Sequence, residues 1–349
     1  MSIEAKTRNS SIELLRIISI ICVIFLHYNH ADIGGGFAYA QPGSLNYYYL
    51  QLTESFSICA VDLMIMVSAY FLSASQERRL IKVIDLMLQL ILFRLAFYFM
   101  YVIAGTPFTM EAFISNLLPK NYFVILYCTL YIISPYINAA CNNLSKENFK
   151  KLLITALLLF SVYSFAIDLL EMRVNTSQLS SVGMYGSQQG YTIVNFVLVY
   201  LVGAYIRRVG LNLSKGKALL GFVICLAVMY AAALMGIGLF LNYNNPVVIL
   251  MAAFILEIFT KLELRSKLIN ELAKAVFTCF LFHTPFLSYL FIGYAASASL
   301  PVLVAHQLGS AVLLLLISYV VYRVYKLCSG WFFRLIGPAV GKINISVTD

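Results

Sequence analysis

The chain has 349 residues with a net charge of +9; 61% of the residues are hydrophobic and 11% are charged, against roughly 25% charged in an ordinary soluble domain. This composition excludes a disordered chain, a nucleic-acid-binding protein and a typical cytosolic enzyme. The positive charge does not indicate nucleic acid, because the Lys and Arg residues lie in short clusters between apolar blocks. We therefore expect an integral membrane protein whose main solvent is the lipid bilayer.

The apolar residues form ten blocks separated by polar breaks, and each block is near the roughly 20 residues that a helix needs to cross a bilayer. The sixth and eighth blocks are the shortest. The prediction is an all-α, polytopic helical bundle, a single transmembrane domain over residues 1–349 with no separate soluble domain. In chain order the expected spans are 12–30, 56–74, 83–104, 121–139, 151–170, 191–206, 217–240, 245–260, 272–293 and 302–325.

The basic residues predict the orientation of the bundle. With ten spans and a cytoplasmic N-terminus, 21 of the 24 Lys and Arg residues fall at the inner ends of spans or in inner loops, among them Lys6, Arg8 and Lys342. Only Lys120 and Arg173 fall in outer loops, and Arg94 lies within the third span. Since inner loops carry an excess of Lys and Arg, this distribution predicts that both termini are cytoplasmic.

The first span carries an arginine and a histidine on one face. Arg16 and His27 are eleven residues apart, which is ~20° more than three full helical turns and corresponds to a rise of ~16 Å. Arg16 is then expected at the inner edge of the membrane, where Glu13 can pair with it, and His27 in the outer half. This pattern suits an anionic donor held by Arg16 whose reactive end reaches His27 as base or nucleophile. The structural alternative is an interfacial arginine and a histidine bonded to a neighbouring helix.

Few other ionisable groups lie at membrane depth, where a charge is costly and each such group is a candidate for function. His283 precedes Pro285 in the ninth span, and a hydrogen-bonded histidine at a kink is the alternative to a catalytic role. Asp62 lies in the second span at a depth similar to that of His27. It could orient a histidine or hold an acceptor hydroxyl, and a structural pair with Arg94 is the alternative.

A basic cluster of Arg78, Arg79 and Lys82 follows the second span on the inner side. It either marks the topology or binds phosphates, which arginine contacts through two parallel hydrogen bonds.

Taken together, these motifs resemble the membrane-bound acyltransferase 3 family, whose members O-acylate bacterial polysaccharides and related acceptors. The arginine and the histidine of the first span, separated by ten residues, resemble the family's mark. The family's second-span motif usually has glycine after its serine, where this chain has Ala69 after Ser68. Further similar segments follow in family order, at residues 61–72, 122–127, 134–138, 200–207 and 273–283.

This resemblance implies an O-acyltransferase, most simply an O-acetyltransferase, of a bacterial plasma membrane. The donor would be acetyl-CoA or another acyl-CoA, with no tightly bound cofactor and no metal, and the acceptor a surface polysaccharide or a lipid-linked sugar. Carried over residue by residue, His27 would be catalytic, with Asp62 and His283 as further catalytic candidates. Arg16, Arg78, Arg79 and Lys82 would then bind the donor.

Two other functions remain open from the sequence. A transporter or flippase of a polar, lipid-linked glycan would use tyrosine-rich spans and Arg94 without any acyl chemistry, although the chain shows no internal repeat. A metal site of His27, His30 and a carboxylate is a more remote reading, because no His-Glu-x-x-His motif is present.

Overall fold

The structure is a computed structural model, and it describes residues 9–341 and 343–347. Over these ranges the chain is almost entirely helical, which confirms the expected all-α fold. Lys6, Arg8 and Lys342, which entered the predicted charge distribution, lie outside the described residues.

The α-helices, in chain order, are α1 (Ser10–Asn29), α2 (Gly36–Tyr39), α3 (Leu45–Ser57), α4 (Ala60–Leu72), α5 (Leu80–Ile103), α6 (Met110–Leu117), α7 (Tyr122–Asn142), α8 (Lys146–Leu157), α9 (Ser164–Glu171), α10 (Ile193–Arg208), α11 (Lys215–Leu234), α12 (Pro246–Thr260), α13 (Lys267–Leu272), α14 (Val276–Leu287), α15 (Ile292–Ser297) and α16 (Leu300–Val340). A π-helical turn, η1 (Leu158–Tyr163), joins α8 to α9, and short 3-10 turns are η2 (Gln188–Gly190), η3 (Gly238–Leu241) and η4 (Ala273–Ala275). Two short strands are β1 (Glu77–Arg79) and β2 (Asn344–Ser346).

Eight helical stretches of the described chain are long and apolar enough to cross a membrane. They are α1, α5, α11 and α16, together with the composite stretches Leu45–Leu72, Met110–Asn142, Lys146–Glu171 and Gly238–Thr260. The other two expected spans correspond to α10, with 16 residues, and to α14, with 12. Both are shorter than the roughly 20 residues of a full crossing.

Polar side chains at the helix starts explain why several helices begin before the expected apolar block. Ser145, for example, accepts a hydrogen bond from the backbone of Asn148, so α8 begins at residue 146 rather than 151. Such a cap satisfies backbone N–H groups that have no partner inside the helix. The hydrophobic pattern shows which residues are apolar, whereas the caps decide where each helix starts.

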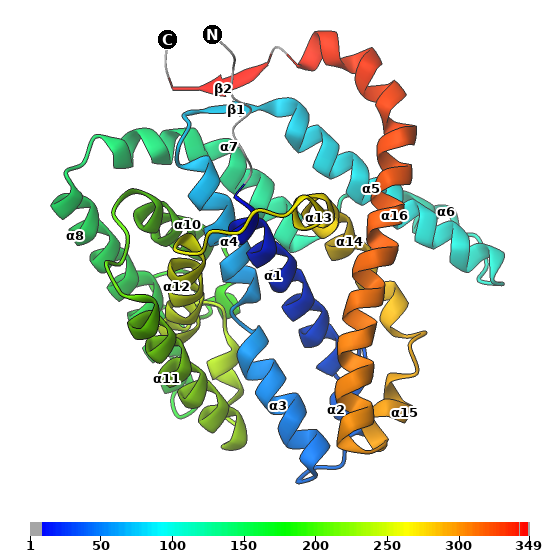
Figure 1. Cartoon of the computed structure of the whole chain (residues 1–349), viewed down its shortest axis with the longest axis horizontal. Coiled ribbons are helices and arrows are strands. Elements are labelled where there is room, and N and C mark those ends of the chain that lie inside the picture. Colours follow the sequence, from blue (N-terminus) through cyan, green and yellow to red (C-terminus); the bar gives the residue numbers. More distant parts are fainter. Residues whose placement is uncertain (1–8, 342, 348–349) are drawn as a thin grey trace.

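Helix α1 lies in the middle of the bundle, among α3, α4, α12, α14 and α16 (Figure 1). Ile12, Leu15, Ile20 and Tyr28 are completely buried along its length. Because α1 is enclosed in this way, its polar side chains face protein or internal cavities rather than lipid. That arrangement is the one expected of functional groups inside a membrane.

Helices α4 and α10 approach each other closely at Gly203. A Cβ at this position would lie 2.5 Å from the carbonyl oxygen of Met66 and 2.8 Å from the Cβ of Ala69. Ala69 replaces the usual glycine of the second-span motif, yet the close contact is kept because its partner on α10 has no side chain. Small residues of this kind allow membrane helices to pack through their backbones.

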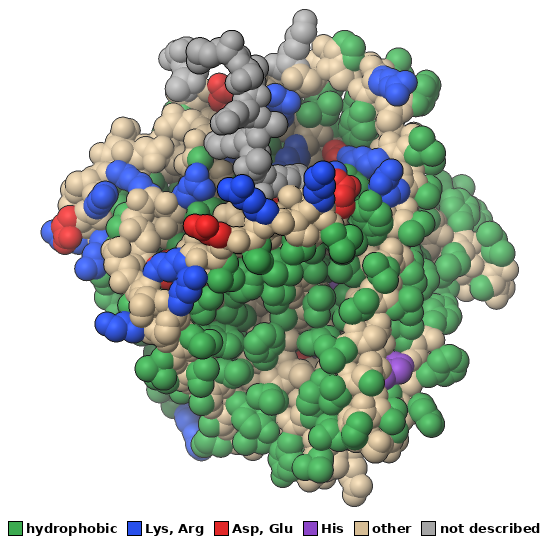
Figure 2. Space-filling model, viewed as in Figure 1, with side chains coloured by type: hydrophobic (Ala, Val, Ile, Leu, Met, Phe, Trp, Pro, Cys, Tyr) green, Lys and Arg blue, Asp and Glu red, His purple; other side chains and the backbone are tan. Residues whose placement is uncertain are grey.

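Positive charge gathers at one end of the molecule, which we call the basic end. Figure 2 shows Lys and Arg side chains along this end and a largely hydrophobic surface below it. Both ends of the described chain lie there (Figure 1), and β1 pairs with β2 in antiparallel register, Arg78 opposite Ile345. This small sheet was not predicted, because strands of three residues leave no periodic pattern. It ties the C-terminal segment to the loop that follows α4.

Candidate active site

Two histidines from opposite ends of the sequence meet inside the bundle. His27 lies in the last turn of α1, and His283 lies on α14. The Nε2 atom of His283 is 2.9 Å from the Nδ1 atom of His27, and the ring centroids are 4.8 Å apart. We call this pair the histidine dyad. It forms because α14 packs alongside α1.

The hydrogen bonds around the dyad assign its protons. His283 Nδ1 is 2.9 Å from the carbonyl oxygen of Cys279, and because a carbonyl only accepts, Nδ1 carries the proton. In the neutral ring, Nε2 of His283 is then an acceptor. His27 Nδ1 lies between this atom and the carbonyl oxygen of Val23, 3.0 Å away, so it must carry a proton as well. The Nε2 atom of neutral His27 is therefore left with a lone pair, as a general base requires.

The dyad lies in a chamber that we call the histidine chamber, with an empty volume of about 1190 Å³. Its wall includes His30 and residues of the loops before α10 and α12, at the end of the molecule opposite the basic end. Three tyrosines line it together: the rings of Tyr122 and Tyr191 are 4.6 Å apart, and those of Tyr191 and Tyr243 are 5.2 Å apart. Asn121, Gln189 and Asn242 add side-chain amides. The chamber thus offers flat aromatic faces and polar groups to a ligand.

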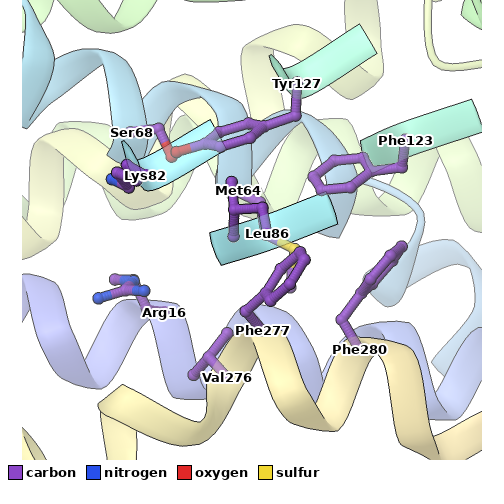
Figure 3. A pocket seen from close by; sticks show the side chains of 10 residues that line it. All are labelled: Arg16, Met64, Ser68, Lys82, Leu86, Phe123, Tyr127, Val276, Phe277 and Phe280. Atoms are coloured by element: carbon purple, nitrogen blue, oxygen red, sulfur yellow. The ribbon is translucent and has the colours of Figure 1, made fainter. Parts of the chain in front are cut away.

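A second cavity, the basic-end pocket, lies on the other side of the dyad, with an empty volume of about 630 Å³. In Figure 3, Arg16 and Lys82 lie at one end of this pocket, and Phe123 and Phe280 lie at the other. Met64 and Leu86 line its middle. The pocket combines a cationic entrance with an apolar interior, which suits a ligand with an anionic head and a less polar arm.

Phe280 separates the two cavities. It lines both the basic-end pocket and the histidine chamber, and its ring packs against Phe123 with centroids 4.8 Å apart. The ring of His283 lies 6.1 Å away on the chamber side. A ligand that extends from the basic-end pocket toward the dyad therefore meets the ring of Phe280.

The sequence was compared with models of known protein families, and one of them matches. The family model of the acyltransferase 3 domain, described as an acyltransferase domain, matches residues 9–323, a range that holds the dyad and both cavities. The chain belongs to the acyltransferase 3 family. No curated protein matches it significantly, and no solved structure does so either.

In this membrane acyltransferase, Arg16 lies toward the basic end of α1. It lines the basic-end pocket, and its guanidinium pairs with Glu13 at 2.8 Å, as the spacing predicted. Lys82 lines the same pocket and lies 5.0 Å from the centre of the Tyr131 ring. Arg79 is exposed beside it at the start of α5. The contact of these three cations with a donor stays a prediction.

Arg78 does not share this position. Its side chain is only 2% exposed, and its guanidinium donates to the Ser134 hydroxyl and to the backbone carbonyls of Leu72, Ser75 and Glu77. Four of its five N–H groups are thus used within the protein. The geometry assigns Arg78 to holding β1 against α7, and its expected contact with a donor stays a prediction.

Asp62 is fully buried on α4 and contacts neither histidine of the acyltransferase. Its two carboxylate oxygens have no regular hydrogen-bond partner among the described residues, and neither do the amide atoms of the buried Asn195. The expected pair with Arg94 is absent as well, since Arg94 donates to the carbonyls of Ser115 and Lys120. The role of Asp62 in orienting a histidine is therefore not supported by its position, and its role toward an acceptor stays a prediction.

Glu54, a carboxylate in the wall of the histidine chamber, is not among the residues that the sequence predicted. Asn29 donates to it at 2.9 Å, Gln307 donates to Asn29 at 2.8 Å, and Tyr49 donates to Gln307 at 2.7 Å. The signal was present, because Glu54 is eight residues before Asp62 in the same apolar stretch. It was overlooked because the expected span began at residue 56, whereas the helical stretch begins at Leu45.

Within the described part of the chain, no three His, Cys, Asp or Glu side chains come together as a metal site would require. His30, the proposed partner of His27 in such a site, accepts a hydrogen bond from the backbone of Asp32.

Proposed function

We propose that this protein transfers an acyl group, most simply acetyl, from cytoplasmic acyl-CoA to a hydroxyl group of a surface polysaccharide or lipid-linked glycan. The observation that carries the proposal is the 2.9 Å contact between His27 Nδ1 and His283 Nε2, in the wall of a tyrosine-rich chamber that shares Phe280 with a cationic pocket. The positive-inside distribution supports a cytoplasmic basic end. The membrane is then the plasma membrane of a bacterium, in line with the resemblance to polysaccharide acylases.

The donor enters from the basic end. Arg16, Arg79 and Lys82 bind the phosphates of CoA, because guanidinium and ammonium groups form charge-assisted hydrogen bonds with phosphate oxygens. The acyl arm extends between Met64 and Leu86 toward Phe280. Since Arg16 and His27 share one helix face at a rise of ~16 Å, an extended arm brings the thioester toward the dyad.

The acceptor occupies the histidine chamber. Sugars present both hydroxyl groups and apolar C–H faces, and the Tyr122, Tyr191 and Tyr243 cluster with its neighbouring amides matches both features. Glu54 accepts hydrogen bonds from sugar hydroxyls that face its side of the chamber.

The chemistry follows from the proton assignment. His27 Nε2 takes the proton of the acceptor hydroxyl while the hydroxyl oxygen attacks the thioester carbonyl. The tetrahedral intermediate collapses, the C–S bond breaks, and the leaving CoA thiolate takes the proton from His27. His283 accepts the hydrogen bond from His27 Nδ1 throughout, so it keeps the ring oriented and stabilises the transient imidazolium. The same Nε2 lone pair also allows an acyl-histidine intermediate.

The experiment uses membranes that contain the wild-type protein or its His27→Gln variant at equal amounts, supplied with acetyl-CoA labelled in the acetyl group. Label is expected in the lipid- or polymer-bound fraction with the wild type, and at least about a hundredfold less with the variant. Equal labelling would remove His27 from the mechanism. Purified protein that neither binds nor hydrolyses acetyl-CoA would instead favour a flippase of lipid-linked glycans.

A further inference from the structure

A third cavity, which we call the lateral crevice, lies between α5, α6 and α14, with an empty volume of about 820 Å³. Its walls are aromatic, with Phe97 and Tyr98 from α5, and it holds two cationic side chains, Arg94 and Lys120. None of the roles described above uses it.

The cations of the crevice are unusual for this chain. Only three of its 24 Lys and Arg residues, Arg94, Lys120 and Arg173, are placed away from the cytoplasmic side by the span assignment. Two of these three meet in the lateral crevice. Topology does not require them there, because the positive-inside rule disfavours basic residues on the far side. Their convergence is therefore better explained by a ligand.

The two cations also lack a counter-ion. Neither forms an ion pair with a carboxylate in the described part of the chain. Arg94 donates to the carbonyl of Ser115 on α6 at 3.3 Å and to that of Lys120 at 3.2 Å, and its buried Nε has no partner among the described residues. Lys120 donates to the neutral hydroxyl of Ser115 at 2.7 Å. A cation at membrane depth without a counter-ion is costly. An anion with several oxygens, such as a phosphate, would balance the charge of both side chains and accept hydrogen bonds from them.

The crevice lies at the lipid-facing side of the molecule. Of the eight candidate spans of the described chain, α5 has the smallest buried share, 17% of its apolar stretch. Helix α6 and the loop before it expose Phe108, Met110 and Ile114. Arg94 lies 14 residues after the basic-end start of α5, a rise of ~21 Å along the helix axis.

The crevice adjoins the histidine chamber. Asn121, Phe280 and Thr284 line both cavities. The hydroxyl of Thr284 is 3.3 Å from Nε2 of His283. A ligand whose charged group rests on Arg94 can thus extend its next group toward the dyad.

We propose that the lateral crevice binds the phosphate group of a lipid-anchored acceptor, which enters from the outer half of the bilayer and presents its sugar to the histidine chamber. The purpose of this binding rests on the proposed acyl transfer, but the lipid phosphate can bind without any acyl transfer taking place. It narrows the acceptor to a lipid-linked glycan carried on a phosphate or pyrophosphate, rather than a finished polymer without lipid.

The test uses the full-length protein in nanodiscs of phosphatidylcholine, which carries no net charge. The probe is a polyprenyl phosphate with a photoreactive diazirine in its chain, compared with the matching polyprenol that lacks the phosphate. Crosslinked peptides are mapped by mass spectrometry, and the concentration dependence of the yield gives the apparent Kd. The variants are Arg94→Gln, Lys120→Gln and Arg94→Lys, with Arg173→Gln as the control because it removes the third such basic residue, outside the crevice.

The phosphate lipid is expected to crosslink to α5, α6 or α14 and to bind at least about tenfold more tightly than the polyprenol, as a charge-assisted contact would give. Arg94→Gln is expected to weaken binding about tenfold, Lys120→Gln about threefold, and Arg94→Lys less than Arg94→Gln, whereas Arg173→Gln binds as the wild type does. If the Arg94 variants fail to fold, Lys120→Gln carries the test, because this side chain is exposed.

Equal binding of polyprenol, unchanged binding by Lys120→Gln, or crosslinks confined to other helices would overturn the proposal. Inorganic phosphate that competes at the same concentration as the lipid would show that the site takes soluble phosphates and would overturn entry from the bilayer. The assay separates this proposal from the proposed function, because His27→Gln is expected to bind the phosphate lipid normally. Loss of acyl transfer in every assay, with lipid binding intact, would refute the proposed function alone.

Discussion

The Nε2 atom of His283 accepts a hydrogen bond from the Nδ1 atom of His27 at 2.9 Å, across 256 positions of sequence. Because Nδ1 of His283 is committed to the carbonyl of Cys279, the direction of this bond follows, and with it the free lone pair of His27. In the proposed mechanism His27 is the base and His283 orients it, so we expect substitutions of the two histidines to have different effects.

Substitution of the two histidines should separate these roles. We expect His27→Gln to lower kcat by about 10²–10⁴-fold, the usual contribution of a general base. His283→Gln keeps an acceptor toward His27 and should lower kcat by only about tenfold, whereas His283→Leu, which has none, should lower it further. The measurement is the rate of label transfer from acetyl-CoA at saturating donor. Equal losses for Gln and Leu at position 283 would contradict a role through the hydrogen bond.

Removal of the Phe280 ring should join the two cavities. We expect Phe280→Ala to raise the hydrolysis of acetyl-CoA in the absence of acceptor severalfold, because water from the histidine chamber then reaches the thioester. The matched control is Phe282→Ala on the same helix, since Phe282 stacks on Phe286, with centroids 4.2 Å apart, and lines neither cavity. Hydrolysis is measured by release of free CoA thiol. An equal rise in both variants would indicate a loosened α14 instead of an opened partition.

Arg78 and Arg79 are neighbours in sequence but should respond differently. Arg78→Gln removes several buried hydrogen bonds from a charged donor, each of which contributes about 1.5–3 kcal/mol, so we expect a clear fall in Tm in detergent. Arg79→Gln should leave Tm near that of the wild type and raise the KM for acyl-CoA severalfold. Thermal unfolding and donor titration measure the two effects. A raised KM in Arg78→Gln without any loss of stability would return Arg78 to the donor site.

Glu54 should act on the acceptor rather than on the donor. Glu54→Gln keeps the size of the side chain but replaces one acceptor oxygen by an N–H donor, and we expect the KM for the acceptor to rise about tenfold, as loss of a hydrogen bond would give. The KM for acyl-CoA should change little, because Glu54 lines the histidine chamber and not the basic-end pocket. Kinetics with each substrate varied in turn make the comparison. A change confined to the donor KM would place Glu54 in a different role.

Gly203 should be intolerant of even one methyl group. A Cβ there would meet the backbone of Met66, which cannot move aside, so Gly203→Ala should destabilise the protein by about 1–3 kcal/mol. Gly309 in α16 has open space around its missing Cβ, and Gly309→Ala should be neutral or slightly stabilising. The two Tm values measured side by side test this difference. Equal Tm values would show that α4 and α10 separate without cost.

Arg16 and His27 show how far reasoning from one helix reaches. Their spacing predicted that both side chains lie on one face of the first span. In the structure, Arg16 lines the basic-end pocket and His27 lines the histidine chamber. Arg78 shows the limit of such reasoning. It looks like its neighbours Arg79 and Lys82 in a linear cluster, and only the structure shows that its guanidinium is bonded to backbone carbonyls of α4, the following turn and β1.

The sequence by itself determined that this is an all-α membrane protein and in what order its main apolar helices follow, because hydrophobicity, spacing and charge along the chain act locally or through the bilayer. Only the tertiary structure decided which polar groups meet. The His27–His283 pair, the partition at Phe280, the burial of Asp62 beside Asn195 and the convergence of Arg94 with Lys120 depend on how helices far apart in sequence pack. The physical reason is that a hydrogen bond or a shared cavity depends on the relative placement of two helices to within about 0.5 Å, which periodicity along one helix does not encode.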